Sequence, residues 1–370
     1  MNRYVVVLLL AFVFSCTSSG QKEEKRNPAN EMAVIAYYFG NATKIDSFPV
    51  EKLTHIIFSF GHLRQTRYVI DNANDTLAIQ KLVSLKSRNP ALKIILSLGG
   101  WGGCEFCSPV FDSVAGRQEF AQSVKEQLIY FKADGIDLDW EYPAIEGYPG
   151  HAYKKEDKTN FTALVKTLRD TLGKGYEISF AAGGFDKFLY ESVEWDKIMP
   201  MLDKVNLMSY DLVSGYSKVT GHHTPLYPTQ QQRQSADNAI RYLDSIGVPL
   251  QKLIIGAAFY ARVWEHVPAI NNGLYQQGVF KSFIGFNQFS KYLLADSGFV
   301  FYRDTVAQAS YAYNVNKKLF ATFDDSLSVA QKTKYVLEKG LGGIMFWELS
   351  LDKTTNGLVD VIDRVRHQKN

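Results

Sequence analysis

Apolar, β-branched segments recur along the chain, with amphipathic stretches between them. Eight segments have the composition of buried strands: 32–39, 54–60, 93–98, 135–140, 177–182, 204–209, 252–258 and 342–347. Apolar residues recur with helical spacing in the stretches between them, for example 118–130, 161–172, 236–246 and 328–339. Alternation of strand and helix predicts a parallel sheet with helical crossovers, and eight such units predict an α/β fold, a TIM (β/α)8 barrel. In that fold the catalytic residues lie at the carboxyl ends of the strands.

One interval is too long for a single helix and its loops. About eighty residues separate the seventh strand segment from the eighth. The stretch 263–316 is rich in aromatic residues and glycine, and it contains short strand-like pieces such as 298–302. We therefore predict an insertion at 263–316, with the barrel itself formed by 31–262 and 317–370.

A run of acidic residues lies at 134–143 and reads Asp-Gly-Ile-Asp-Leu-Asp-Trp-Glu-Tyr-Pro. Asp137, Asp139 and Glu141 occupy every second position of the expected strand, so their carboxylates share one face. Where that face is enclosed, crowding and loss of hydration raise the pKa of at least one of them. General acid catalysis near neutral pH requires a protonated carboxyl beside ionised ones. The run therefore predicts an acid–base enzyme.

A solvated edge strand and a calcium-binding loop are the alternatives for such an acidic triplet. Ile136, Leu138 and Trp140 alternate with the acids, so the opposite face is apolar and suits an inner barrel strand with a helix outside. A calcium loop needs oxygen ligands on a flexible loop with a sharp glycine turn, and bulky residues between the acids fit this poorly. Asp134 has the opposite parity to the triplet, and we interpret it as structural.

The N-terminal residues have the pattern of a secretory signal peptide, because an apolar run extends to Phe14 and polar residues follow. Residues 13–16 also resemble a bacterial lipoprotein cleavage box. We predict a lipoprotein-type signal peptide at 1–15, acylation of Cys16, and a charged tether at 16–30. Ordinary signal cleavage is the alternative. The expected protein is exported and lipid-anchored at the outer membrane or cell surface of a bacterium, or else secreted.

Composition narrows the range of partners. The formal net charge is +3, from 41 basic and 38 acidic residues, which gives no electrostatic case for nucleic acid or for an anionic membrane surface. With 46% hydrophobic and 21% charged residues the bulk of the chain is globular, and 14% aromatic residues offer flat faces to an uncharged substrate such as a sugar. We expect a monomer without cofactor or metal, attached to a membrane only through a lipid anchor.

Two residue pairs invite a metal or redox interpretation. Cys104 and Cys107 form a Cys-x-x-Cys, but the chain has 3 cysteines in all, which does not support a four-ligand zinc site. In an exported protein we expect a disulfide rather than a redox centre, and it would stiffen the loop after the third strand. His222 and His223 have no acidic residue nearby in the sequence, so we expect surface or loop-packing residues rather than metal ligands.

Several motifs together resemble family 18 glycoside hydrolases, the chitinases and their relatives. The acidic run resembles the signature of that family. Four further motifs appear in the family's order: Ser-Leu-Gly-Gly-Trp at 97–101, Met-Ser-Tyr-Asp at 208–211, Gly256 with Phe-Tyr-Ala-Arg at 259–262, and Gly-Gly-Ile-Met-Phe-Trp at 342–347. The resemblance spans 33–365. It implies that the insertion is the small α+β insertion of one chitinase subfamily, which would form a wall beside a deep groove.

The resemblance also implies a role for each site residue. Glu141 would protonate the glycosidic oxygen as the general acid. The 2-acetamido oxygen of the sugar would attack its own anomeric carbon, Asp139 would bind the acetamido N–H, and Asp137 would share a proton or hydrogen bond with Asp139. Tyr210 would donate its hydroxyl to the acetamido oxygen. The other implied contacts are support of Asp137 by Tyr37 and Ser97, contact with the sugar by Asp211, an apolar floor at Trp347, and further substrate contacts at Phe60, Gly100, Trp101, Met208, Tyr260 and Arg262.

Three functions fit this pattern. The first is a chitinase that cleaves β-1,4-linked N-acetylglucosamine in chitin or chito-oligosaccharides with retention of configuration. The second is an endo-β-N-acetylglucosaminidase acting on N-glycans, since such enzymes can share the acidic motif, although the aromatic insertion and Trp347 favour chitin. The third is a non-catalytic chitin-binding lectin. Such lectins typically lack the acid glutamate, whereas Glu141 is intact here together with Asp137 and Asp139.

Overall fold

The computed structural model describes residues 32–368. The predicted signal peptide at 1–15, the tether at 16–30 and the lipidation site Cys16 lie outside the described residues. Within the described part, no helix combines the length and the apolar character needed to cross a bilayer.

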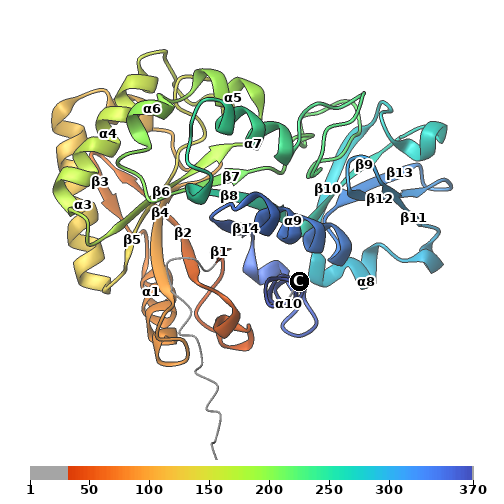
Figure 1. The fold of residues 1–370 in the computed structure, drawn as a ribbon, viewed down its shortest axis with the longest axis horizontal. Helices are drawn as coiled ribbons and strands as arrows, with labels where there is room; N and C mark the ends of the chain where they lie inside the picture. The colour runs from red at the N-terminus through yellow and green to blue at the C-terminus, as the bar shows by residue number, and fades with distance from the viewer. Residues whose placement is uncertain (1–31, 369–370) are drawn as a thin grey trace, which may run out of the picture. The chain divides into compact units, whose positions relative to one another are not determined.

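Eight parallel strands close into a barrel, which confirms the predicted TIM fold (Figure 1). They are β1 (Ala33–Tyr38), β2 (His55–Arg64), β4 (Lys93–Gly99), β5 (Gly135–Asp139), β6 (Glu177–Gly183), β7 (Lys204–Met208), β8 (Leu253–Ala258) and β14 (Gly343–Trp347). Each strand pairs with the next in this order, and β14 pairs back onto β1. The bounds lie within one residue of the predicted segments, except that β2 continues to Arg64 and forms a hairpin with β3 (Arg67–Val69).

Helices follow most of the barrel strands. They are α1 (Ala73–Ser84), α2 (Cys107–Phe111), α3 (Val114–Phe131), α4 (Asp157–Leu172), α5 (Asp186–Glu191), α6 (Trp195–Ile198), α7 (Ala236–Ser245), α8 (Phe289–Tyr292), α9 (Ser326–Lys339) and α10 (Leu358–Arg366). The connection from β1 to β2 departs from the regular pattern, because it contains only the 3-10 turns Ile45–Ser47 and Val50–Lys52. The first strand is therefore covered without an α-helix of its own.

Several helices begin at polar residues that cap their free N–H groups. Ser113 accepts a hydrogen bond from the backbone of Gly116 at the start of α3. Asp325 caps α9 in a capping box with Ser328. Gly340 ends α9 in the left-handed conformation, which glycine adopts without steric cost. These local signals explain why α9 occupies almost the predicted range.

Side chains alternate between the inside of the barrel and the layer under the helices. Ile136, Leu138 and Trp140 belong to the large apolar cluster shared by strands and helices. Residues of opposite parity fill the barrel interior, where a second cluster comprises Ala33, Ile35, Tyr37, Ile57, Ile95, Tyr210, Ile254, Ala258, Tyr260 and Met345. This alternation places Asp137 and Asp139 on the inner face of β5.

A second sheet lies in the interval between β8 and β14 (Figure 1). It is antiparallel, with the order β10-β9-β13-β12-β11. Its strands are β9 (Tyr260–Glu265), β10 (Val279–Gly285), β11 (Val300–Asp304), β12 (Ala309–Asn314) and β13 (Leu319–Phe323). The sheet thus extends beyond 263–316 at both ends, because β9 follows β8 almost directly and β13 leads into α9. The predicted boundaries of a separate insertion domain stay a prediction.

Candidate active site

Asp137 lies on the inner face of β5 and is fully buried. Its Oδ2 accepts hydrogen bonds from the Tyr37 hydroxyl at 3.0 Å and the Ser97 hydroxyl at 2.9 Å. Its Oδ1 accepts from the Ser179 hydroxyl at 2.6 Å and the Asn206 amide at 3.0 Å. Burial raises the pKa of Asp137, while these four donors lower it. Every lone-pair direction of the carboxylate is thereby used by a neutral donor.

Asp139 is almost as buried as Asp137, but its surroundings are different. Among residues 32–368, its Oδ1 has no hydrogen-bond partner. Burial raises the pKa of Asp139 well above its ordinary value, and the charges of Glu141 and Asp137 raise it further. A proton shared among these acids is therefore held best by Asp139, because Asp137 already receives four hydrogen bonds.

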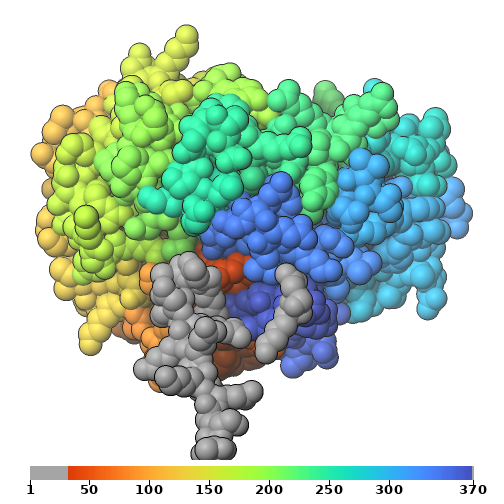
Figure 2. All heavy atoms as spheres, in the orientation of Figure 1, coloured from red at the N-terminus to blue at the C-terminus, as the bar shows by residue number. Residues whose placement is uncertain are grey.

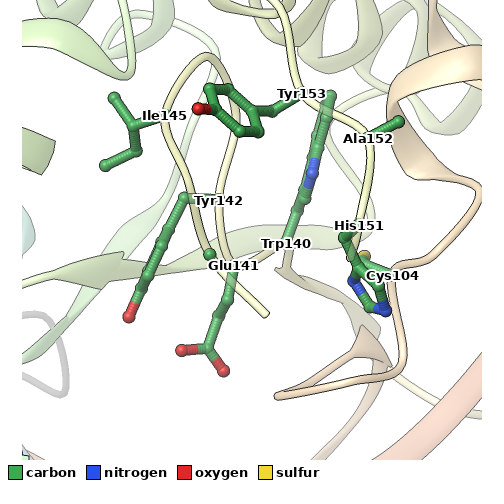
Figure 3. A pocket seen from close by; sticks show the side chains of 9 residues that line it. Cys104, Trp140, Glu141, Tyr142, Ile145, His151, Ala152 and Tyr153 are labelled. Carbon is green, nitrogen blue, oxygen red and sulfur yellow. The ribbon is translucent and has the colours of Figure 1, made fainter. Parts of the chain in front are cut away.

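Glu141 lies two residues beyond the end of β5, and not within the strand as the alternation had indicated. It is half-buried, and burial raises its pKa from 4.5 to about 7, with a further increase from the charge of Asp211. Figure 3 shows Glu141 and Tyr142 extending in the same direction, away from Ile145 and Tyr153, on the wall of a small pocket that Cys104 and His151 also line. Glu141 thus offers a half-buried carboxyl that holds a proton near neutral pH.

Aromatic rings form a floor at the carboxyl ends of β1, β2 and β14. Trp347 is stacked on Phe60, with ring centroids 5.7 Å apart and an interplanar angle of 13°. Tyr37 and Phe39 contact Trp347 at centroid distances of 5.9 and 6.3 Å. Gly100 has φ +77°, and a Cβ there would come within 2.4 Å of the Phe60 ring, so only glycine fits beneath it. The floor is apolar and partly exposed, which suits the face of a sugar ring.

Tyr210 and Asp211 follow β7 on the opposite side of the barrel mouth. The Tyr210 hydroxyl lies 3.8 Å from the Met345 sulfur, and its ring packs against Tyr260. Asp211 has a left-handed backbone with φ 56° and receives a bidentate ion pair from Arg262, with Nη2 to Oδ2 at 2.5 Å. Burial opposes ionisation of Asp211, but the hydrogen bonds and charges of Arg262 and His223 hold its pKa well below the ordinary range. Arg262, expected as a groove contact, is thus engaged with Asp211.

The sequence suggested that the two adjacent histidines are surface or loop-packing residues, and the structure shows buried, loop-packing residues. Both His222 and His223 are fully buried. His222 lies 3.0 Å from Asp304 on β11, and Nδ1 of His223 lies 3.4 Å from Asp211. The acidic neighbours come from elements distant in sequence, so the local sequence could not reveal them. Each histidine faces a different carboxylate, and both extend from the loop after β7 to pack against residues of the second sheet, His222 against Tyr311 and His223 against Tyr260.

Exposed aromatic residues continue beyond Glu141 on the other side of the mouth. Trp101, in the loop after β4, is 44% exposed. Its ring lies 5.6 Å from that of Tyr148 and 6.0 Å from that of Tyr216, which belongs to the loop after β7. Loops from two separate strands therefore meet through Trp101 and Tyr216, and they extend the aromatic surface away from Trp347.

Short contacts stiffen the loop that carries Trp101. Cys104 and Cys107 are joined by a disulfide. The N–H of Gly100 donates to the carbonyl of Asp139 at 2.8 Å, which ties this loop to the acidic strand. Asp134, interpreted as structural, accepts a hydrogen bond from the N–H of Ile94 at 2.7 Å at the amino end of β5.

The structure thus brings together the residues that the motifs singled out, and it adds four. Asp137, Asp139, Glu141, Tyr37, Ser97, Met208 and Tyr210 lie around the barrel interior and mouth, with Phe60, Gly100, Trp347, Tyr260, Asp211, Arg262 and Trp101 around them. The sequence analysis did not identify Ser179, Asn206, Phe39 or Tyr216. For Ser179 and Asn206 a signal existed, because each is a polar residue in the middle of a strand that is apolar beyond its charged first residue.

Fold and site together define a TIM-barrel protein with a cluster of acidic side chains of raised pKa at the carboxyl end of β5. The profile of glycosyl hydrolases family 18 matches residues 34–352. The chain belongs to this family.

Individual relatives agree with the assignment. The chain is 35% identical over 300 residues to Chitinase A1 of Niallia circulans, covering 74% of this chain and 43% of that protein. It is 34% identical over 323 residues to Chitotriosidase-1 of Mus musculus, covering 81% of this chain and 67% of that protein. The solved structure of a family 18 N-acetylglucosaminidase from Paenibacillus barengoltzii matches with 35% identity and a TM-score of 0.82, over 90% of this chain and all of that one. The chain spans less than half the length of Chitinase A1.

Proposed function

We propose that this protein hydrolyses the β-1,4 linkages of chitin or chito-oligosaccharides with retention of configuration, using the acetamido group of the substrate as the nucleophile. The observation that supports this most is the unequal environment of the three acids. Asp137 receives four hydrogen bonds, Asp139 has no donor to its Oδ1 among residues 32–368, and Glu141 is half-buried with a raised pKa. The names of the curated relatives point to the same substrate class.

Glu141 and Asp139 have different roles in the proposed reaction. Glu141, protonated near neutral pH, gives its proton to the glycosidic oxygen as the C–O bond breaks. A retaining glycosidase of the ordinary type needs a second ionised carboxylate as its nucleophile. Asp139 is unsuited to that task because burial and neighbouring charges favour its protonated form. The 2-acetamido oxygen of the sugar therefore forms the new bond to the anomeric carbon.

The remaining residues hold the cyclised sugar and complete the cycle. Asp139 accepts the acetamido N–H at its unprotonated oxygen and thereby orients the acetamido group for attack. Among residues 32–368 the Tyr210 hydroxyl has only a weak acceptor, the Met345 sulfur, so it is available to the acetamido oxygen. Water then attacks the anomeric carbon as the bond from this carbon to the acetamido oxygen breaks, and the ionised Glu141 takes a proton from the water, which regenerates the acid.

Product analysis tests this function. The protein is incubated with chitin, with N-acetylglucosamine oligomers of defined length and with a high-mannose glycoprotein, and the products are identified by mass spectrometry. We expect cleavage of the oligomers and no release of N-glycans. Release of intact N-glycans alone would favour the endo-β-N-acetylglucosaminidase, and binding without turnover would favour a lectin. Because one matched structure is described as an N-acetylglucosaminidase, the product lengths also distinguish release of monomers from release of longer pieces.

We further propose that the protein is exported and carries a lipid at Cys16. The apolar run up to Phe14 and the sequence 13–16 support this proposal. In cells that express the full chain, labelled palmitate should be incorporated by the natural protein and not by Cys16→Ala. Equal incorporation by both would contradict lipid attachment at this residue.

A further inference from the structure

A fully buried ion pair lies outside the carboxylate cluster. Lys332 is on α9, and Asp324 directly follows β13. The Lys332 Nζ lies 2.6 Å from Asp324 Oδ2, and both side chains are 0% exposed. Figure 2 shows α9, in blue, at the surface between α7 and the second sheet, so Lys332 occupies the inner side of a helix whose outer side faces solvent.

Such a pair is a poor source of stability. Removing two charges from water costs several kcal/mol each, and well-packed apolar residues often replace a buried pair at no loss of stability. Burial lowers the pKa of Lys332, while Asp324 opposes that effect. The pair is better explained by the backbone groups that it fixes in place.

Those groups belong to the ends of β7 and β8. Lys332 Nζ donates to the Thr224 hydroxyl and to the carbonyl of Gly256 at 3.3 Å. Asp324 Oδ2 accepts from the N–H of Ala258 at 2.9 Å. The Thr224 hydroxyl oxygen lies 3.1 Å from Asp324 Oδ2 and 3.3 Å from the carbonyl oxygen of Ser209. The ion pair thus ties α9, β8 and the loop after β7 to the residue that precedes Tyr210.

Tyr210 depends on this support for its position. Its hydroxyl contacts only the Met345 sulfur at 3.8 Å within the described part of the chain. Its ring packs on Gly256, where a Cβ would lie 2.8 Å from a ring carbon. Ser209 Oγ in turn accepts from the N–H of Gly256 at 2.9 Å. Both the backbone and the ring of Tyr210 are therefore set by groups that Lys332 and Thr224 hold.

We propose that Lys332 is a positioning residue for Tyr210: through Thr224 and Gly256 it fixes the place at which the Tyr210 hydroxyl meets the substrate. The inference rests on the proposed function. Lys332 touches no substrate, and its effect on turnover passes through Tyr210 alone.

A double-mutant cycle tests this inference. The paired change Lys332→Met with Asp324→Asn removes both charges and keeps the apolar stem of the lysine. It is made in the natural protein and in Tyr210→Phe, and kcat and KM are measured with 4-methylumbelliferyl chitobioside. In the natural background we expect kcat to fall tenfold or more with less than a twofold change in KM. In the Tyr210→Phe background the same change should lower kcat less than twofold.

Two further variants separate positioning from general loss of stability. Thr224→Val removes only the hydroxyl between Lys332 and Ser209, and it serves as the test if the charge-free variant does not fold. It should show the same dependence on Tyr210. Glu177→Gln disrupts another buried network, with Lys93 and Lys204 at 2.9 and 2.8 Å, at the amino ends of the strands. It should lower Tm without changing kcat.

Each outcome has a definite meaning. Equal losses of kcat in both backgrounds, or no loss in either, would overturn the inference while leaving the proposed function intact. A natural protein without activity on this substrate or on chitin oligomers would overturn the proposed function, and the inference with it.

Discussion

Asp137 and Asp139 are two residues apart and similarly buried, yet their hydrogen-bonding surroundings differ. Four neutral donors from β1, β4, β6 and β7 converge on Asp137. Asp139 has an oxygen without a partner among the described residues. This contrast makes Asp139 the better holder of a proton, and it is consistent with the proposed role of Glu141 as the acid that meets the substrate.

Replacement of Glu141 tests that assignment. Glu141→Gln keeps the shape of the side chain but has no proton to give. We expect kcat on chitin oligomers to fall by at least about 100-fold, the usual contribution of a general acid, while the oligomers still bind. Steady-state kinetics and calorimetric binding provide the measurement. Turnover within a few-fold of the natural protein would remove Glu141 from this role.

The pH dependence of activity tests the electrostatics around Glu141. Its pKa of about 7 predicts that kcat/KM falls as pH rises through 7, because the acid then loses its proton. The negative charge of Asp211 contributes to raising this pKa, so Asp211→Asn should move the alkaline limb to lower pH. Asp170→Asn, a change on the exposed face of α4, is the control and should leave the limb in place. An unmoved limb in Asp211→Asn would contradict this electrostatic account.

At the residue scale, the sequence could predict what depends on local parity. The spacing of Asp137 and Asp139 on one strand was sufficient to place both inside the barrel. Ser179 and Asn206 reach Asp137 from 42 and 69 residues away, through a register that no local pattern specifies. The acidic partners of His222 and His223 were missed for the same reason.

The loop between β4 and α2 joins the acidic strand to the exposed aromatic surface. It carries Trp101, it is tied to the carbonyl of Asp139 through Gly100, and the bridge between Cys104 and Cys107 closes it. We expect a rigid loop here to keep Trp101 in place for a sugar unit beyond the one that is cleaved.

Removal of the bridge should loosen this loop. For Cys104→Ser with Cys107→Ser, we expect a loss of about 2 kcal/mol in the free energy of unfolding, as for a short closed loop. We also expect removal of the bridge to raise KM for the tetramer of N-acetylglucosamine more than it raises KM for short substrates. Denaturant titration and kinetics on oligomers of increasing length provide the measurement. An unchanged KM for every length would show that the bridge does not serve substrate binding.

The elements themselves were largely predictable, since apolar strand segments and capped helices leave clear local signals. The departures have physical causes. The unit after β1 uses 3-10 turns, and β2 extends into a hairpin, because tertiary packing rather than local pattern sets those connections. The second sheet incorporates residues 260–262 and 319–323 that pattern alone assigned to the barrel.

The raised pKa values of Glu141 and Asp139 should make the stability of the whole molecule depend on pH. The pKa of Glu141 is raised from 4.5 to about 7, so the folded protein holds a proton that the unfolded chain releases between these values. Stability that is present below pH 4.5 is therefore lost as pH rises through 7, and the raised pKa of Asp139 acts with the same sign.

This pH dependence can be measured as a difference in Tm between the natural protein and a variant without the Glu141 carboxyl. Glu141→Gln does not titrate, so its Tm relative to the natural protein should increase between pH 4.5 and pH 8. Glu146→Gln, an exposed neighbour in the same loop, should show no such trend. A Tm difference for Glu141→Gln that is constant across this range would contradict burial as the cause of the raised pKa.

The proposed reaction depends on attack of the sugar's own acetamido group on the anomeric carbon. The most direct measurement is kcat/KM for aryl chitobiosides whose scissile sugar carries an acetyl, fluoroacetyl, difluoroacetyl or trifluoroacetyl group on nitrogen. Fluorine withdraws electrons from the amide oxygen, so the account predicts a steep fall in kcat/KM with each added fluorine. A rate that does not depend on fluorination would show that the nucleophile comes from elsewhere.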